Sequence, residues 1–135
     1  MSSCPQNVAD WLGCTPDEAV RVGDGWAHPS AQVDATATIG RDVRIGKGAW
    51  IGSGVAVGAG VTVGTDATVG AGAWIGVGVK VGSGVTIGRG AWIMSGVQIG
   101  AGATIRSGAL IRSGASIGRG ALVGREATVK GTDVR

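Results

Sequence analysis

The strongest constraint in this sequence is an aliphatic residue at every sixth position. Val or Ile occupies each member of a series that runs without exception from Val33 to Val129. The residue four positions after each of them is Ala or Val, from Ala37 to Ala127. Gly usually follows the aliphatic residue, and Gly or Asp usually stands two residues further on. Such regular self-similarity is the signature of a repeat architecture built from one small unit.

Side-chain alternation within one unit predicts its geometry. In the unit that contains Ala91, Trp92, Ile93 and Met94, alternate side chains of a strand point to opposite sides. We therefore expect Ala91 and Ile93 to point inward and Trp92 and Met94 to point outward, with a two-residue turn after them. Three such units close a triangular coil, and successive coils stack at about 4.8 Å. The sequence thus predicts an all-β fold, a single parallel β-helix of about six triangular coils.

Composition excludes the main alternatives. Gly contributes 28 of the 135 residues, but it does not recur at every third position and only 3 residues are Pro, which excludes collagen. Hydrophobic residues make up 44% of the chain and are regularly placed, which argues against disorder. Frequent Gly and an apolar period of six also exclude an α-helix within the repeats.

The first residues of the chain lack the repeat. Thr15-Pro16-Asp17-Glu18 fits a capping box, which predicts a short helix over about 16–22. We therefore divide the chain into an N-terminal helical cap segment at 1–26, a β-helix at 27–131 and a tail at 132–135.

The pattern aliphatic-Gly-x-x-small-x resembles that of the bacterial hexapeptide-repeat superfamily. The segment 28–40, His-Pro-Ser-Ala-Gln-Val-Asp followed by Ala-Thr-Ile-Gly at 37–40, is similar to the entry coil of the lipid A type acyltransferases. This resemblance implies a left-handed coil and a homotrimer. It also implies an acyl carrier bound in the cleft between subunits and a His that acts as general base.

The chain departs from those enzymes in ways that bear on function. No insertion interrupts residues 33–130, and the single histidine, His28, lies in the first coil. We therefore predict an oligomeric scaffold or binding module without an evident active site or cofactor, with His28 as the weak candidate for a catalytic residue. The alternative is an acyl- or acetyltransferase that uses coenzyme A or an acyl carrier protein at a subunit cleft.

Other reactive residues point to no site. Asp42 and Asp66 occupy the turn position, where Asp tolerates a left-handed backbone. One His cannot supply the three His ligands that carbonic anhydrases of this architecture use for zinc. Cys4 and Cys14 precede the repeats and form no CxxC motif, so we predict no metal site and reduced thiols.

Outward residues that are three units apart share a face of the predicted prism. One face carries an exposed apolar cluster, which we expect to be an interface that joins the chain into a homotrimer. The cluster consists of Trp74, Trp92, Met94 and Leu110. A site for another protein or a ligand, and end-to-end polymers joined through open coil ends, remain alternatives. Another face carries a single column of threonines, Thr68, Thr86 and Thr104. Ice-binding β-helices resemble an array with two columns of Thr, so this single column does not favour ice binding.

Charge adds little to these predictions. The net charge is +3, and the basic residues towards the end form either a solvated rim or a patch for an anionic partner. No aromatic residue is interleaved with them, so we expect no nucleic-acid groove. The chain has no uninterrupted apolar run of about 18 residues and no charged, apolar leader at its start, which predicts a cytoplasmic protein without a membrane span.

Overall fold

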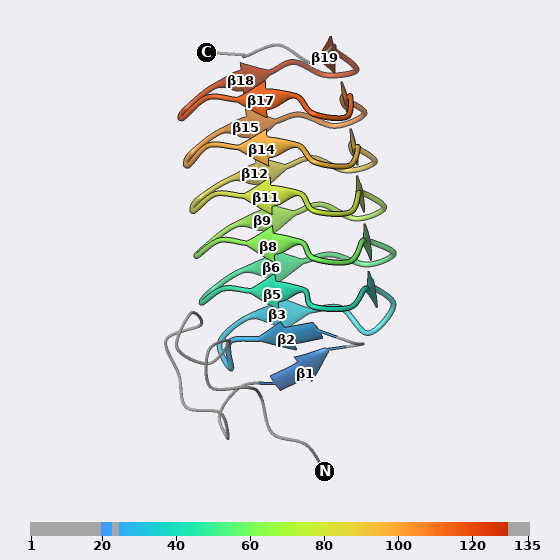
Figure 1. The fold of residues 1–135 in the computed structure, drawn as a ribbon, viewed down its shortest axis with the longest axis vertical. Helices are drawn as coiled ribbons and strands as arrows, with labels where there is room; N and C mark the ends of the chain where they lie inside the picture. Colours follow the sequence, from blue (N-terminus) through green and yellow to red (C-terminus); the bar gives the residue numbers. More distant parts are fainter. Residues whose placement is uncertain (1–19, 23–24, 130–135) are drawn as a thin grey trace.

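The computed structural model describes residues 20–22 and 25–129, which form a stack of coils with a sheet along each of three sides (Figure 1). Sheet A contains β1 (Val20–Val22), β2 (Gly25–Ala27), β5 (Arg44–Ile45), β8 (Thr62–Val63), β11 (Lys80–Val81), β14 (Gln98–Ile99) and β17 (Ser116–Ile117). Sheet B contains β3 (Gln32–Val33), β6 (Trp50–Ile51), β9 (Thr68–Val69), β12 (Thr86–Ile87), β15 (Thr104–Ile105) and β18 (Leu122–Val123). Sheet C contains β4 (Thr38–Ile39), β7 (Ala56–Val57), β10 (Trp74–Ile75), β13 (Trp92–Ile93), β16 (Leu110–Ile111) and β19 (Thr128–Val129).

From β2 onward consecutive strands lie on different sheets, and each strand from β2 to β16 pairs in parallel with the strand three further along the chain. In sheet C, for example, Trp74 is opposite Trp92 and Ile75 is opposite Ile93. This register means that three six-residue sides complete one coil. The predicted β-helix of about six triangular coils is therefore confirmed.

The aliphatic series forms the core. Every member from Ile39 to Val129 is buried, and Val33 in the first coil is partly buried against them. The Ala or Val sites from Val43 to Ala121 are buried too, so each side contributes one larger and one smaller inward side chain. No polar or charged side chain is buried among the described residues. The core is thus a continuous aliphatic column.

Hydrogen bonds between coils extend beyond the two paired residues of each strand. The N–H groups of Trp74 and Gly76 donate to the carbonyls of Ala91 and Ile93 at 2.8 and 2.7 Å. Each side therefore contributes about four residues to the stack, although regular pairing covers two of them.

From Asp42 onward, the turns have a left-handed backbone at their second residue. Gly90 has φ +67°, and the three residues other than Gly with positive φ are Asp42, Asp66 and Glu126, all among the described residues. The two aspartates occupy the position predicted for them. A second kind of Gly precedes the turn, where space is short, because a Cβ on Gly64 would lie 2.6 Å from a backbone carbon of the next coil.

One end of the described stack differs from the prediction. Of the helix predicted over about 16–22, residues 20–22 form strand β1, which pairs antiparallel with β2, Val20 opposite Ala27. The unpaired edge of sheet A offers hydrogen bonds to this Val-rich segment, and that pairing overrides the local helical preference. The rest of the predicted helix, including its capping box, lies outside the described residues. Over residues 20–22 and 25–129 no helix is long and apolar enough to cross a membrane.

The column predicts a large effect of truncating one inward side chain. Ile93 is fully buried, so Ile93→Ala should lower the free energy of unfolding by about 2–5 kcal/mol, through lost burial and the cavity left behind. Gln98→Ala, at an exposed outward position, should change it by less than about 0.5 kcal/mol. Urea denaturation followed by circular dichroism measures both, and equal effects would contradict the assigned core.

The turns predict a separate effect of backbone conformation. A Cβ on Gly90 would meet no atom within 4 Å, so only the positive φ opposes a side chain there. Gly90→Ala should cost about 1 kcal/mol, whereas Gly90→Asn should cost less, because Asn tolerates this conformation better. The same denaturation measurement compares them, and an Asn variant less stable than the Ala variant would refute the explanation.

Candidate functional site

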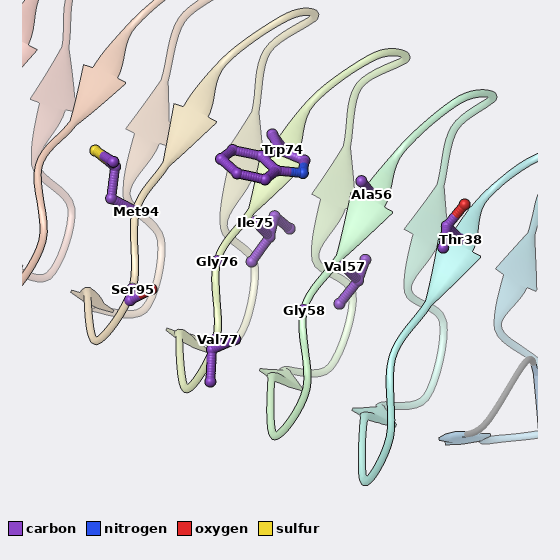
Figure 2. Close-up of a pocket in the computed structure, with 10 residues that line it drawn as sticks. All are labelled: Thr38, Ala56, Val57, Gly58, Trp74, Ile75, Gly76, Val77, Met94 and Ser95. Atoms are coloured by element: carbon purple, nitrogen blue, oxygen red, sulfur yellow. The ribbon is translucent and has the colours of Figure 1, made fainter.

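A hollow of about 330 Å³ lies on sheet C, beside the turns that lead from sheet C to sheet A (Figure 2). Small residues such as Ala56 and Gly58 leave this part of the surface hollow, and larger side chains such as Trp74 and Met94 border it. The lining consists of Thr38, Ala56, Val57, Gly58, Trp74, Ile75, Gly76, Val77, Met94 and Ser95. Figure 2 shows that these residues come from successive coils, with Val77 and Ser95 at the turns.

Trp74, which lines this hollow, forms an aromatic pair with Trp92 of the next coil. The rings of Trp74 and Trp92 are 4.9 Å apart between centroids and inclined at 40°, and the side chains are 42% and 49% exposed. This geometry is within the range of favourable aromatic pairs. The structure places Leu110 on the next strand of sheet C and Met94 just after β13, both partly buried. The predicted apolar cluster is therefore contiguous, and its role as an interface stays a prediction.

Sequence reasoning missed Val77, which is 56% exposed and borders the hollow. Val77 is the first residue of a turn, and turn residues were treated only as connectors. The sequence does distinguish Val77 from the other turns. From Arg41 onward, the first residue of every other turn is Ala, Ser, Thr, Lys or Arg. An exposed aliphatic residue at a turn pointed to an apolar site.

The residues that line the hollow favour binding of an apolar or flat group. The polar side chains among them are the hydroxyls of Thr38 and Ser95, and no side chain in this lining is titratable. A site of this kind is lined by apolar side chains and a few polar groups, as small-molecule sites usually are. A ligand in this hollow would be held by shape and burial, and no titratable side chain of the lining would accept its proton.

His28 lies elsewhere, after β2 at the edge between sheets A and B. The backbone N–H of Ser30 donates to its Nδ1 at 3.0 Å, and Ser30 Oγ lies 2.8 Å from the same nitrogen. The N–H of Gly48, in the next coil, donates to Ser30 Oγ at 3.1 Å. A neutral imidazole whose Nδ1 accepts carries its proton on Nε2, which leaves no free lone pair for a general base. The contacts favour a structural role in the first turn.

Asp34 occupies the same place at the next turn. Its Oδ1 accepts from the Thr36 hydroxyl at 2.6 Å and from the Thr36 N–H at 2.8 Å, and these two bonds hold the pKa of Asp34 below its ordinary value. The N–H of Gly54 in turn donates to Thr36 Oγ1 at 2.9 Å. Asp34 is thus engaged in the turn. No group of three or more His, Cys, Asp and Glu residues gathers within the described ranges, so these ranges hold no candidate metal site.

The late basic residues do not gather on one surface. Arg106 and Arg125 follow strands of sheet B, whereas Arg112 follows a strand of sheet C and Arg119 a strand of sheet A. They therefore belong to three different edges of the prism. This distribution agrees better with a solvated rim than with one patch for an anionic partner.

Comparison with known proteins gives the fold a chemical context. A model described as bacterial transferase hexapeptide (six repeats) matches residues 42–77 and 78–113, more than half of the chain, and a model for the hexapeptide repeat of succinyl-transferase matches residues 60–95. No curated protein sequence matches the chain.

Two solved structures are similar over most of the chain. The acetyltransferase domain of PglB from Neisseria gonorrhoeae FA1090 has a TM-score of 0.78 and 28% identity, over 81% of this chain and 53% of that one. A mutant of perosamine N-acetyltransferase from Caulobacter crescentus, in complex with CoA and GDP-perosamine, has a TM-score of 0.59 and 26% identity, over 82% of this chain and 51% of that one. The chain spans about half the length of these two proteins. With its repeats matched by the family model over more than half of its length, the chain belongs to the bacterial transferase hexapeptide family.

Proposed function

We propose that this chain is an acyltransferase that moves an acetyl or similar acyl group from coenzyme A to an amine or hydroxyl acceptor. The observation that carries the proposal is the apolar hollow on sheet C, bordered by Trp74, in a chain of the transferase hexapeptide family. Both similar structures are acetyltransferases, and one of them was solved with CoA. This proposal replaces the oligomeric scaffold that the sequence favoured with the acyltransferase that was the alternative.

The sequence favoured a scaffold because its repeats lack a cluster of titratable side chains. Acyl transfer, however, needs few groups from any one chain. The acceptor attacks the thioester carbonyl, the C–S bond breaks, and the acceptor's proton passes to a base within about 3 Å. The lining of the hollow supplies no such base. We propose that a second copy faces sheet C and completes the site, as the predicted homotrimer through the face of Trp74 and Trp92 would allow.

Binding of coenzyme A tests the proposal. Acetyl-CoA should raise the unfolding temperature saturably, because a ligand at 100 times its Kd stabilises by about 2.7 kcal/mol. Val77→Trp should fill the hollow and weaken this binding by at least about tenfold. Ser113→Trp is the matched control, since Ser113 occupies the same turn position two coils further on, outside the lining. Absence of saturable stabilisation of the native chain would contradict the proposal.

The role of His28 is tested separately. His28→Asp should retain the fold and the acyl-transfer activity, because Asp34 shows that a carboxylate accepts the same pair of bonds in the next turn. His28→Ala should lower stability by about 1 kcal/mol, through loss of those bonds. Release of the CoA thiol, measured with acetyl-CoA and a panel of nucleotide-linked amino sugars, reports activity. A folded His28→Asp variant without thiol release would instead assign a catalytic role to His28.

A further inference from the structure

The side chains that line the hollow indicate which part of an acyl-CoA thioester it can hold. Their polar groups are the hydroxyls of Thr38 and Ser95 and the indole N–H of Trp74, and the rest of the lining is apolar or glycine. The nucleotide of coenzyme A carries phosphates and its pantetheine arm carries amides. Burial of such groups without hydrogen-bond partners is unfavourable. The acyl group is therefore the part of the thioester that matches this lining.

The free space lies on one side of the Trp74 side chain. In sheet C, Trp74 is opposite Trp92 of the next coil and opposite Ala56 of the preceding coil. The Trp92 ring packs against Trp74 with 4.9 Å between the centroids, and Trp92 is not part of the lining. On the side of the preceding coil, the same outward position carries only the methyl group of Ala56. The column of indoles thus ends where the hollow begins.

This gap has the height of one flat ring. Trp74 and Thr38 are two coils apart, about 9.6 Å on the usual spacing of parallel strands. Carbon atoms in contact are about 3.5–4.0 Å apart, so a ring stacked on the Trp74 indole lies near the level of Ala56. Gly58 and Gly76, which have no side chain, extend the space towards the turns.

Building on the proposed function, we infer that the hollow holds the aromatic ring of an aroyl thioester, stacked on Trp74 beside Ala56. The ring takes the place of a third aromatic side chain in the column. Figure 2 shows Trp74 and Met94 towards one end of the hollow and Thr38 at the other. Indoles and thioethers both make favourable contacts with aromatic rings. The two large side chains of this end are therefore suited to an aromatic acyl group.

An acetyl group is too small for this space. A dry apolar cavity of about 150 Å³ holds benzene, and the hollow has about 330 Å³. An aroyl group covers much of the apolar lining, whereas the methyl of an acetyl group leaves most of it in water. Each buried methylene-sized group tightens binding by about fourfold. The aroyl thioester should therefore bind more tightly than acetyl-CoA.

A sugar and an alkyl chain match the hollow less well. A sugar carries a hydroxyl on most of its carbon atoms, which is more than Thr38 and Ser95 can pair. An alkyl chain is flexible, so it loses more conformational freedom on binding than a rigid ring, and it cannot stack on an indole. A ring satisfies both the shape and the polarity of the lining.

Transfer of an aroyl group uses the reaction already proposed. The nitrogen or oxygen of the acceptor bonds to the acyl carbon, and the C–S bond breaks. The acceptor's proton passes through the base to the sulfur, which leaves as the coenzyme A thiol. The ring takes no part in these steps, so it can lie in a lining that has no titratable side chain.

A series of thioesters tests the inference on the full chain. Isothermal titration calorimetry measures the Kd of acetyl-, heptanoyl- and benzoyl-CoA. Benzoyl-CoA should bind at least about tenfold more tightly than acetyl-CoA, through burial of the ring. It should also bind at least about threefold more tightly than heptanoyl-CoA, which has the same number of acyl carbons but cannot stack.

Two tryptophan variants separate stacking from general apolar contact. Trp74→Leu keeps an apolar side chain in the lining but removes the indole, so the preference for benzoyl-CoA over heptanoyl-CoA should disappear. Trp92→Leu is the matched control, because Trp92 is similarly exposed on the same sheet but lies outside the lining. Its preference should stay at about threefold or more. Circular dichroism checks that both variants are folded.

A filling variant tests the position of the ring. Ala56→Phe places an aromatic side chain of the protein itself in the gap, and should weaken binding of benzoyl-CoA by at least about tenfold. Thr62→Phe is the control, since Thr62 is the outward residue of the next strand in the same coil, on sheet A. It should leave the Kd of benzoyl-CoA within about twofold of the native value.

Three results would overturn the inference while acyl transfer stands. They are equal affinities for acetyl- and benzoyl-CoA, tighter binding of heptanoyl-CoA than of benzoyl-CoA, and equal effects of Trp74→Leu and Trp92→Leu. A chain that binds none of the three thioesters would overturn the proposed function together with the aroyl site. The pattern of affinities therefore distinguishes failure of the aromatic donor from failure of the transferase.

Discussion

The whole molecule depends on burial of one aliphatic side chain per six-residue side. The residues of the column from Ile39 to Val129 are buried, and each coil adds three more of them to the same apolar interior. A side of any other length would place the next Val or Ile outside. From Asp42 onward a left-handed turn residue, usually Gly and otherwise Asp or Glu, ends each side after the same number of residues. Core and turns are therefore two aspects of one constraint.

This constraint leaves the outward positions free to vary, and the candidate site lies among them. From β5 onward sheet A carries polar and charged residues at its outward strand positions, whereas sheets B and C carry the exposed tryptophans. The hollow exists because Ala56, Gly58 and Gly76 lie next to Trp74 and Met94. Stacked, regular strands thus give an irregular surface, in which large and small residues alternate in a way that the core does not dictate.

The fold could be predicted almost completely from the sequence, because the period, the turn residues and the inward series repeat in every coil. The prediction was wrong over residues 20–22, where Val20 and Val22 extend sheet A as part of β1. There the antiparallel pairing of β1 with β2 determined the structure, and a helix-capping motif does not predict such a strand pairing. The cluster of Trp74, Trp92, Met94 and Leu110 was predictable from equal spacing along one face.

Val77 marked an apolar position at a turn, but the shape of the hollow was not predictable, because it depends on how residues of several coils lie beside Val77. The choice between scaffold and transferase was not predictable either. The side chains that line the hollow include no titratable group, so neither they nor the repeat pattern distinguishes a catalytic site from a binding site. His28 illustrates the converse problem, because its presence suggests chemistry, whereas its Nδ1 is occupied by Ser30.

The constraint of six residues per side is tested most directly by the unfolding of two deletion variants. Removal of residues 79–96 deletes one complete coil and leaves every remaining residue on its original face. Removal of Ser83 alone shortens one side by one residue and displaces the strands that follow. The account predicts a cooperative β-structured unfolding transition, near that of the native chain, for the larger deletion and a severely destabilised chain for the smaller one. A single-residue deletion that is as stable as the native chain would contradict it.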